Sequence, residues 1–129
     1  MVAGQVESRH EAEARQLSPT ALRRIQAASA LLVSPISFWE LAMLVEKGRV
    51  ALDRPTQEWV IDFLESNKVH VAELSSAIAV SAGELADFHG DPADRLIVAT
   101  ARSLRLPVVT KDDKIRVYAK STRLVTAIW

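Results

Sequence analysis

Cysteine is absent from this chain of 129 residues. Its absence excludes disulfide bonds, thiolate metal sites and a cysteine nucleophile. No apolar run approaches the length of a membrane span, and no secretory signal is visible, so we expect a cytoplasmic protein that does not contact a membrane. Internal repeats, low-complexity tracts and interdomain linkers are also missing. We therefore expect residues 1–129 to form a single domain, with an atypical polar segment at residues 1–16.

The composition is that of an ordinary soluble globular protein, with 49% hydrophobic and 25% charged residues. The formal net charge is zero, but residues 1–94 contain 8 Lys and Arg against 14 Asp and Glu, whereas residues 95–129 contain 8 against 2. A basic segment beside an acidic site suits a polyanionic substrate, and scattered charges on a solvated surface are the alternative. The basic residues of the second segment are Arg95, Arg102, Arg105, Lys111, Lys114, Arg116, Lys120 and Arg123.

Short apolar runs alternate with amphipathic stretches along the chain. We predict strands near residues 31–34, 69–74, 106–110 and 124–126. We predict helices near residues 18–28, 37–47, 56–66, 77–86 and 92–104, and a short helix near residues 115–118. This alternation is typical of an α/β fold with a mainly parallel sheet. Ligands of such sheets bind beyond the carboxyl ends of the strands.

Asp94 is a carboxylate at the head of an apolar helix. We predict that Asp91 caps this helix and that Pro92 occupies its first position. Ile97 and Val98 follow Asp94 at helical spacing, so its carboxylate begins an apolar stripe. A carboxylate in that setting requires hydrogen bonds, a cation or a metal. The alternative is that Asp94, at the third helical position, only caps the helix and interacts with its dipole.

Two further carboxylates have similar settings. Glu40 is the only charged residue within residues 38–45, although Ser37 to Glu40 also matches a capping box, in which Glu40 bonds back to the backbone of Ser37. Asp112 lies just after a predicted strand. Because parallel strands end at the same edge, we expect Glu40, Asp94 and Asp112 to meet around an acidic pocket. Clustered carboxylates favour a hard divalent cation, Mg²⁺ or Mn²⁺, which can activate water for attack on phosphate.

Three segments occur in a fixed order along the chain: SFWELA at residues 37–42 followed by EKG at 46–48, HGDPADRLIVATA at 89–101, and LPVVTKD at 106–112. Together they resemble a PIN domain of the VapC toxin type, and the resemblance covers about residues 17–129. It implies a three-layer α/β fold in which helices flank a mainly parallel central sheet.

The resemblance also implies the activity of an Mg²⁺-dependent endoribonuclease and the role of a toxin in a toxin–antitoxin module. The acidic residues that match the family's metal site are Glu40, Asp94 and Asp112, with Asp113 as a substitute for Asp112. RNA is then the substrate, and a cognate antitoxin is the partner that fills the acidic groove. Apolar residues in helices 38–45 and 59–64 further predict a homodimer or an antitoxin complex through these helices.

One feature of the family has no counterpart in residues 1–16. The family's first strand ends in an aspartate that binds metal, but no aspartate here precedes Asp53, and Glu7, Glu11 and Glu13 lack a preceding apolar strand. We therefore expect that the strand either is encoded upstream or has been lost. The alternative function is accordingly a catalytically impaired PIN-like module that binds an antitoxin or RNA without efficient cleavage.

Overall fold

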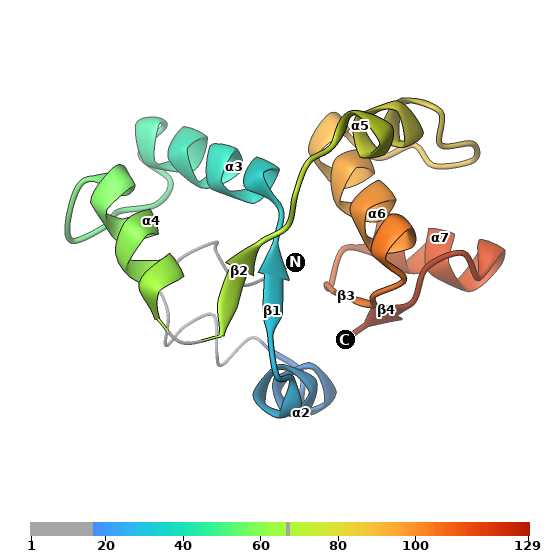
Figure 1. The fold of residues 1–129 in the computed structure, drawn as a ribbon, viewed down its shortest axis with the longest axis horizontal. Helices are drawn as coiled ribbons and strands as arrows, with labels where there is room; N and C mark the ends of the chain where they lie inside the picture. Colours follow the sequence, from blue (N-terminus) through green and yellow to red (C-terminus); the bar gives the residue numbers. More distant parts are fainter. Residues whose placement is uncertain (1–16, 67) are drawn as a thin grey trace.

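In the computed structural model, the structure describes residues 17–66 and 68–129, so the expectations for residues 1–16 lie outside it. One or two helices separate successive strands along the described chain, as the sequence predicts (Figure 1). The helices are α2 (Pro19–Ala27), α3 (Pro35–Glu46), α4 (Thr56–Glu65), α5 (Ser76–Gly83), α6 (Pro92–Leu104) and α7 (Asp113–Thr122). The strands are β1 (Leu31–Val33), β2 (Val69–Val71), β3 (Val108–Val109) and β4 (Ala127–Ile128). None of the described helices is long and apolar enough to cross a membrane.

The described strands form two parallel pairs. β1 pairs with β2, and β3 pairs with β4. Figure 1 shows α3 and α4 beside the first pair, and α6 and α7 beside the second. The parallel arrangement confirms the predicted fold class. Within residues 17–66 and 68–129, however, no ladder joins β1 to β3, so the sheet is not continuous there.

A mostly apolar cavity of about 390 Å³ separates the two strand pairs. Leu31 and Leu32 of β1 line one side, while Val108 and Val109 of β3 line the other. The end of α2 and the last turn of α6 also contribute to its wall. The two halves of the fold therefore face each other mainly through apolar side chains.

Helix α6 forms the centre of the larger hydrophobic core. Val98 is fully buried, and Ile97 packs in a cluster with Phe88, Tyr118 and other apolar residues of α7 and β3. Six residues of α6 are buried, among them Ala93, Ile97 and Val98. A smaller cluster around Leu41 and Trp59 joins α3 to α4. The core thus fixes the position of the N-terminus of α6, where Asp94 lies.

Several predicted boundaries are confirmed and others are wrong. Asp91 caps α6 as predicted, and Ser18 caps α2 at the predicted start of that helix. Helix α3, in contrast, begins at Pro35 because Ser34 caps it by accepting from the N–H of Ile36 at 3.3 Å. Ser37 therefore lies inside the helix, and the capping-box alternative for Glu40 is wrong.

The predicted last strand at residues 124–126 is also misplaced. Helix α7 extends to Thr122, and Arg123 closes it in the left-handed conformation with a φ of 59°. The chain becomes extended only after this cap, so Ala127 and Ile128 make the pairing with β3. Helix α5 likewise ends at Gly83, three residues before the predicted end.

Candidate functional site

The N-terminus of α6 holds Asp94 in a fixed position. The Asp91 carboxylate accepts from the backbone N–H of Asp94 at 2.8 Å, and Pro92 occupies the first helical position, where its missing N–H costs nothing. Asp94 is half-buried at the third helical position. Because Asp91 provides the cap, the Asp94 carboxylate is not needed to begin the helix.

Arg95 fixes the loop that precedes this helix. Its guanidinium donates to four backbone carbonyls at the end of α5 and in the following loop, at distances from 2.6 to 3.1 Å. The four acceptors are the carbonyls of Ala82, Gly83, Leu85 and Phe88. These contacts explain why α5 ends early, since its last carbonyls bond to Arg95. From the sequence, Arg95 is predicted only as one of the basic residues, but a guanidinium on an apolar helix indicates that nearby carbonyls accept from it.

Close packing also restricts the loop at Gly90. A Cβ at Gly90 would lie 2.5 Å from the ring of Phe88, which is closer than real Cβ contacts. That ring packs edge-on against Tyr118 with 5.2 Å between centroids. Glycine therefore allows the loop to approach the Phe88–Tyr118 pair just before Asp91.

Glu40 reaches the site from α3, which contacts α6. Its side chain is partly buried, and this burial raises the pKa of the carboxyl above its ordinary value. The negative charge of Asp91 raises the pKa further. Glu40 and the N-terminal region of α6 are therefore close enough to interact through their charges.

Asp112 lies at the junction of β3 and α7. Its carboxylate caps α7 by accepting from the N–H of Ile115 at 3.0 Å, and its own N–H donates to the hydroxyl of Thr110 at 3.0 Å. The sequence predicts Asp112 as a site carboxylate in the loop after the strand, but not its role as the cap of α7. Asp113, the predicted substitute, is the first residue of α7 and is almost fully exposed, with a carboxylate oxygen 3.8 Å from Arg116.

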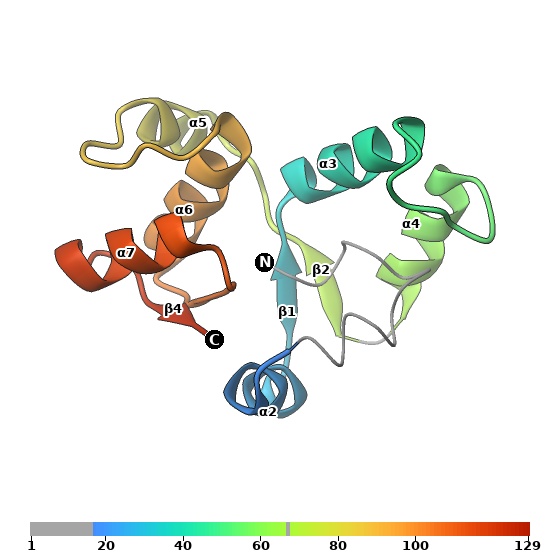
Figure 2. The same ribbon diagram turned by 180° about the vertical axis from the view of Figure 1, so that it is seen from behind.

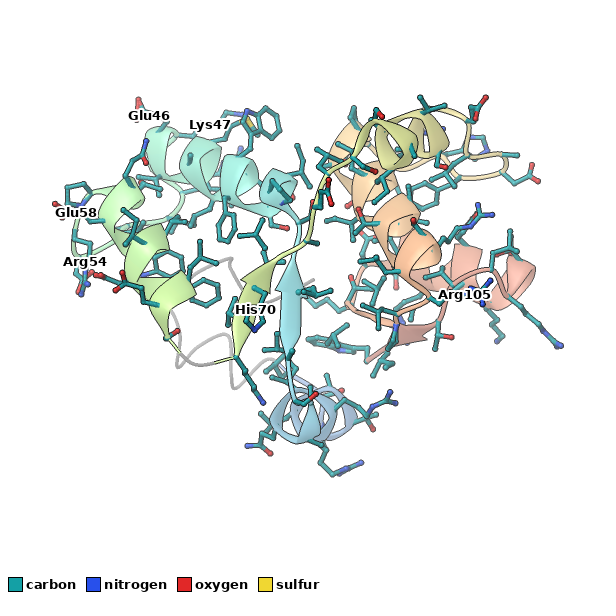
Figure 3. The ribbon with its side chains drawn as sticks, viewed as in Figure 1. Glu46, Lys47, Arg54, Glu58, His70 and Arg105 are labelled. Atoms are coloured by element: carbon teal, nitrogen blue, oxygen red, sulfur yellow. The ribbon has the colours of Figure 1, made fainter. Side chains whose placement is uncertain are left out.

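The carboxylates share one region of negative potential. Burial and then the charges of Asp91, Asp112 and Glu40 raise the pKa of Asp94 to about 6. The ion pairs of Arg54 with Asp53 and Asp62, and of Arg116 with Asp113, do not involve Glu40, Asp94 or Asp112. Figure 3 labels other charged side chains, with Glu46 and Lys47 at the C-terminal end of α3 and Arg54 and Glu58 near the start of α4.

The chemistry of these donors fits a hard divalent cation, because carboxylate oxygens are the ligands that Mg²⁺ and Mn²⁺ prefer. Each of the capping carboxylates, Asp91 and Asp112, bonds to the backbone through one oxygen. The positions of these carboxylates fit a metal ion less well than their chemistry does. Within residues 17–66 and 68–129, no three acidic or histidine side chains converge closely enough to hold a metal ion as they stand.

Comparison with known proteins decides the family. The sequence model of the PIN domain matches residues 9–121. The chain belongs to the PIN domain family. This PIN domain is also 40% identical over 106 residues to Ribonuclease VapC22 of Mycobacterium tuberculosis (strain ATCC 25618 / H37Rv), a match that covers 81% of the chain and 80% of that protein. No solved structure matches the chain significantly. The resemblance to a VapC-like PIN domain, inferred from three sequence segments, is thereby confirmed.

Proposed function

We propose that this PIN domain is a metal-dependent endoribonuclease that acts as the toxin of a toxin–antitoxin module. The observation that carries the proposal is the group of carboxylates around the N-terminus of α6, where burial and then the charges of Asp91, Asp112 and Glu40 raise the pKa of Asp94. Such a group of like charges is costly without a cation. The similarity to Ribonuclease VapC22 supports nuclease activity, with RNA as the substrate.

In this proposal Glu40, Asp94 and Asp112 hold Mg²⁺ or Mn²⁺ through their carboxylate oxygens, and Asp113 is the substitute for Asp112. The ion would activate water and stabilise the charge that develops on the phosphate. Asp94 must lose its proton to act as a ligand, so its raised pKa makes metal binding sensitive to pH near 6. Asp91 and Arg95 hold the helix and loop that position Asp94.

The cellular context is part of the same proposal. A cognate antitoxin is the expected protein partner, and the cytoplasm is the expected location, because that is where a nuclease of this type meets RNA. Helices α3 and α4 offer apolar surface for a partner or for a homodimer. Trp39 on α3 is 55% exposed and Ile61 on α4 is 54% exposed.

A second candidate function is a PIN module that binds RNA or an antitoxin without efficient cleavage. It is favoured by one observation, namely that no three metal-binding side chains converge among the described residues. The two functions differ in a direct measurement. The nuclease converts RNA to shorter products, whereas the binding module retains RNA at full length.

The deciding experiment is cleavage of a 5′-labelled RNA by the purified chain, with and without Mg²⁺ or Mn²⁺. We expect metal-dependent cleavage in the wild type and a loss on the order of 100-fold in Glu40→Gln, Asp94→Asn and Asp112→Asn. Asn at position 112 can still cap α7, so this loss would not come from unfolding. Asp87→Asn, at an exposed loop position with no role in this proposal, is the matched control and is expected to cleave almost normally. RNA that stays intact with every ion would overturn the nuclease proposal.

A further inference from the structure

A surface groove of about 780 Å³ runs along α7, beginning one residue after Asp112. Figure 2 shows α7 and β4 side by side, with α6 behind them. The outer face of α7 forms one wall, and the segment that leads into β4 forms the other. The residues that line the groove are Asp113, Arg116, Val117, Ala119, Lys120, Arg123, Val125, Thr126 and Ala127.

The charge in this groove is mostly positive. Arg116, Lys120 and Arg123 are all exposed there, against one carboxylate at Asp113. Arg116 lies 3.8 Å from Asp113 in an exposed pair, which contributes little to stability and leaves the cation available. Lys120 and Arg123 make no ion pair within residues 17–66 and 68–129.

The cations occur at helical spacing. Arg116 and Lys120 are four residues apart and so lie on one face of α7, while Arg123 follows at the C-cap. At a rise of about 1.5 Å per residue, Lys120 lies about 10 Å along the helix from Asp113. The row of positive charge therefore extends away from the acidic site at a scale that suits a chain of phosphates.

The same face also offers apolar surface between the charges. Val117 lines the groove between Arg116 and Lys120 and is 66% exposed. Grooves that bind single-stranded nucleic acid combine cations for the backbone with aromatic side chains on which bases stack, whereas the apolar surface between the cations of this groove is aliphatic. A groove lined by cations alone would not have an apolar side chain between the charges.

We propose that the α7 groove binds the phosphate backbone of the RNA strand next to the cleaved bond, with Lys120 and Arg123 as its main phosphate contacts. The inference rests on the proposed function, because it takes RNA as the substrate and Asp112 as part of the site. It adds the direction in which the strand leaves that site, along α7 from Asp113 toward Arg123.

The test measures binding separately from cleavage. All variants carry Asp94→Asn, and a fluorescein-labelled single-stranded RNA of 12 nucleotides is titrated in EDTA while its fluorescence anisotropy is followed. We expect Lys120→Gln with Arg123→Asn to raise the Kd about tenfold at low salt. The slope of log Kd against log salt concentration should fall by about 1.4, since each single-strand phosphate contact contributes about 0.7.

A matched double variant controls for loss of positive charge. Lys114 lies on α7 outside the groove lining, and Arg105 closes α6 with a φ of 55°, much as Arg123 closes α7 with a φ of 59°. Asn tolerates that conformation at both sites. Lys114→Gln with Arg105→Asn is expected to change the Kd less than twofold.

Three results would overturn the proposal: equal Kd values for the groove variant and the wild type, an equal loss in the control variant, or binding of polyglutamate as tight as RNA and equally sensitive to the groove variant. The last result would assign the groove to acidic protein segments. A tenfold loss confined to the groove variant supports RNA binding there even if the wild type fails to cleave, so the two proposals can fail separately.

Discussion

The Asp91 carboxylate accepts a 2.8 Å hydrogen bond from the backbone N–H of Asp94, and its charge raises the pKa of the Asp94 side chain. One residue therefore stabilises the start of α6 while it makes the neighbouring carboxylate harder to ionise. The cap needs only an acceptor oxygen at position 91, whereas the effect on the pKa of Asp94 needs the negative charge of Asp91. A substitution that keeps the oxygen and removes the charge can therefore separate the two effects.

Asp91→Asn should keep the cap and remove the charge. We expect the pKa of Asp94 to fall toward its ordinary value, with the free energy of unfolding changed by less than about 0.5 kcal/mol. Asp91→Ala should lower the same pKa but also cost about 1 kcal/mol of stability, because the cap is lost. NMR titration of the Asp94 carboxyl carbon and urea unfolding measure the two effects. An unchanged Asp94 pKa in both variants would contradict this interpretation.

The stability of the chain should depend on pH through Asp94. Its pKa of about 6 lies above the ordinary 3.8, so the folded state binds this proton more tightly than the unfolded state. The free energy of unfolding therefore falls as pH rises from about 4 to about 6 and stays lower above that range. Asp94→Asn should thus be more stable than the wild type at about pH 7.5, by about 1 kcal/mol after allowance for solvent screening of a half-exposed group.

Thermal unfolding across pH checks this expectation. The difference between Asp94→Asn and the wild type should vanish near about pH 3, where both folded and unfolded Asp94 are protonated. Asp87→Asn, at an exposed loop position, is the control and should show no such change. Added Mg²⁺ should stabilise the wild type but not Asp94→Asn. A Tm of Asp94→Asn below that of the wild type at pH 7.5 would refute the electrostatic argument.

Alanine at Gly90 should disturb the loop before α6. The new Cβ would meet the Phe88 ring at 2.5 Å, so that ring or the loop backbone must move away from the Tyr118 contact. We expect a cost of about 1–3 kcal/mol, as for other overpacked sites. Gly83→Ala is the matched control, because a Cβ there meets nothing within 4 Å. Urea unfolding should show Gly83→Ala to be neutral or slightly stabilised, and equal effects at both glycines would argue against the packing explanation.

Two serines at the start of α3 should respond with opposite signs. Ser34 caps the helix, so Ser34→Ala should cost about 1 kcal/mol. The Ser37 hydroxyl is buried and lacks a hydrogen-bond partner in the described residues, so Ser37→Ala should gain about 1 kcal/mol. The difference in urea midpoints tests this pair. A loss of stability in Ser37→Ala would indicate that the hydroxyl has a partner that the structure does not show, such as bound water.

Local chemistry made part of the fold predictable from sequence. Asp91-Pro92 and Ser18-Pro19 each combine a capping side chain with a proline suited to the first helical position, and both helices begin there. Ser34-Pro35 carries the same signal, but the capping box from Ser37 competed with it, and the earlier proline determined the start of α3. The end of α5 was not predictable, because it depends on Arg95, which lies twelve residues beyond Gly83.

The sequence indicates which residues belong to the candidate site, but it does not predict how they are arranged. The three carboxylates stood out because each lies in an apolar setting, and the structure shows that Glu40 and Asp112 both affect the pKa of Asp94. Their distances and the caps made by Asp91 and Asp112 depend on how α3, α6 and α7 pack together. Sequence spacing does not contain that information, because the packing involves contacts between distant segments.

The hydrogen bonds of Arg95 affect how often the loop between α5 and α6 opens. Because one guanidinium donates to carbonyls from Ala82 to Phe88 while its Cα belongs to the buried helix α6, the loop cannot swing outward unless several of these donors lose their acceptors together. Amide protons of the loop should then exchange with solvent in the same cooperative event as those in the first turns of α6. A surface segment thereby acquires the slow opening of the hydrophobic core, which keeps Asp91 and Asp94 aligned between encounters with ligands.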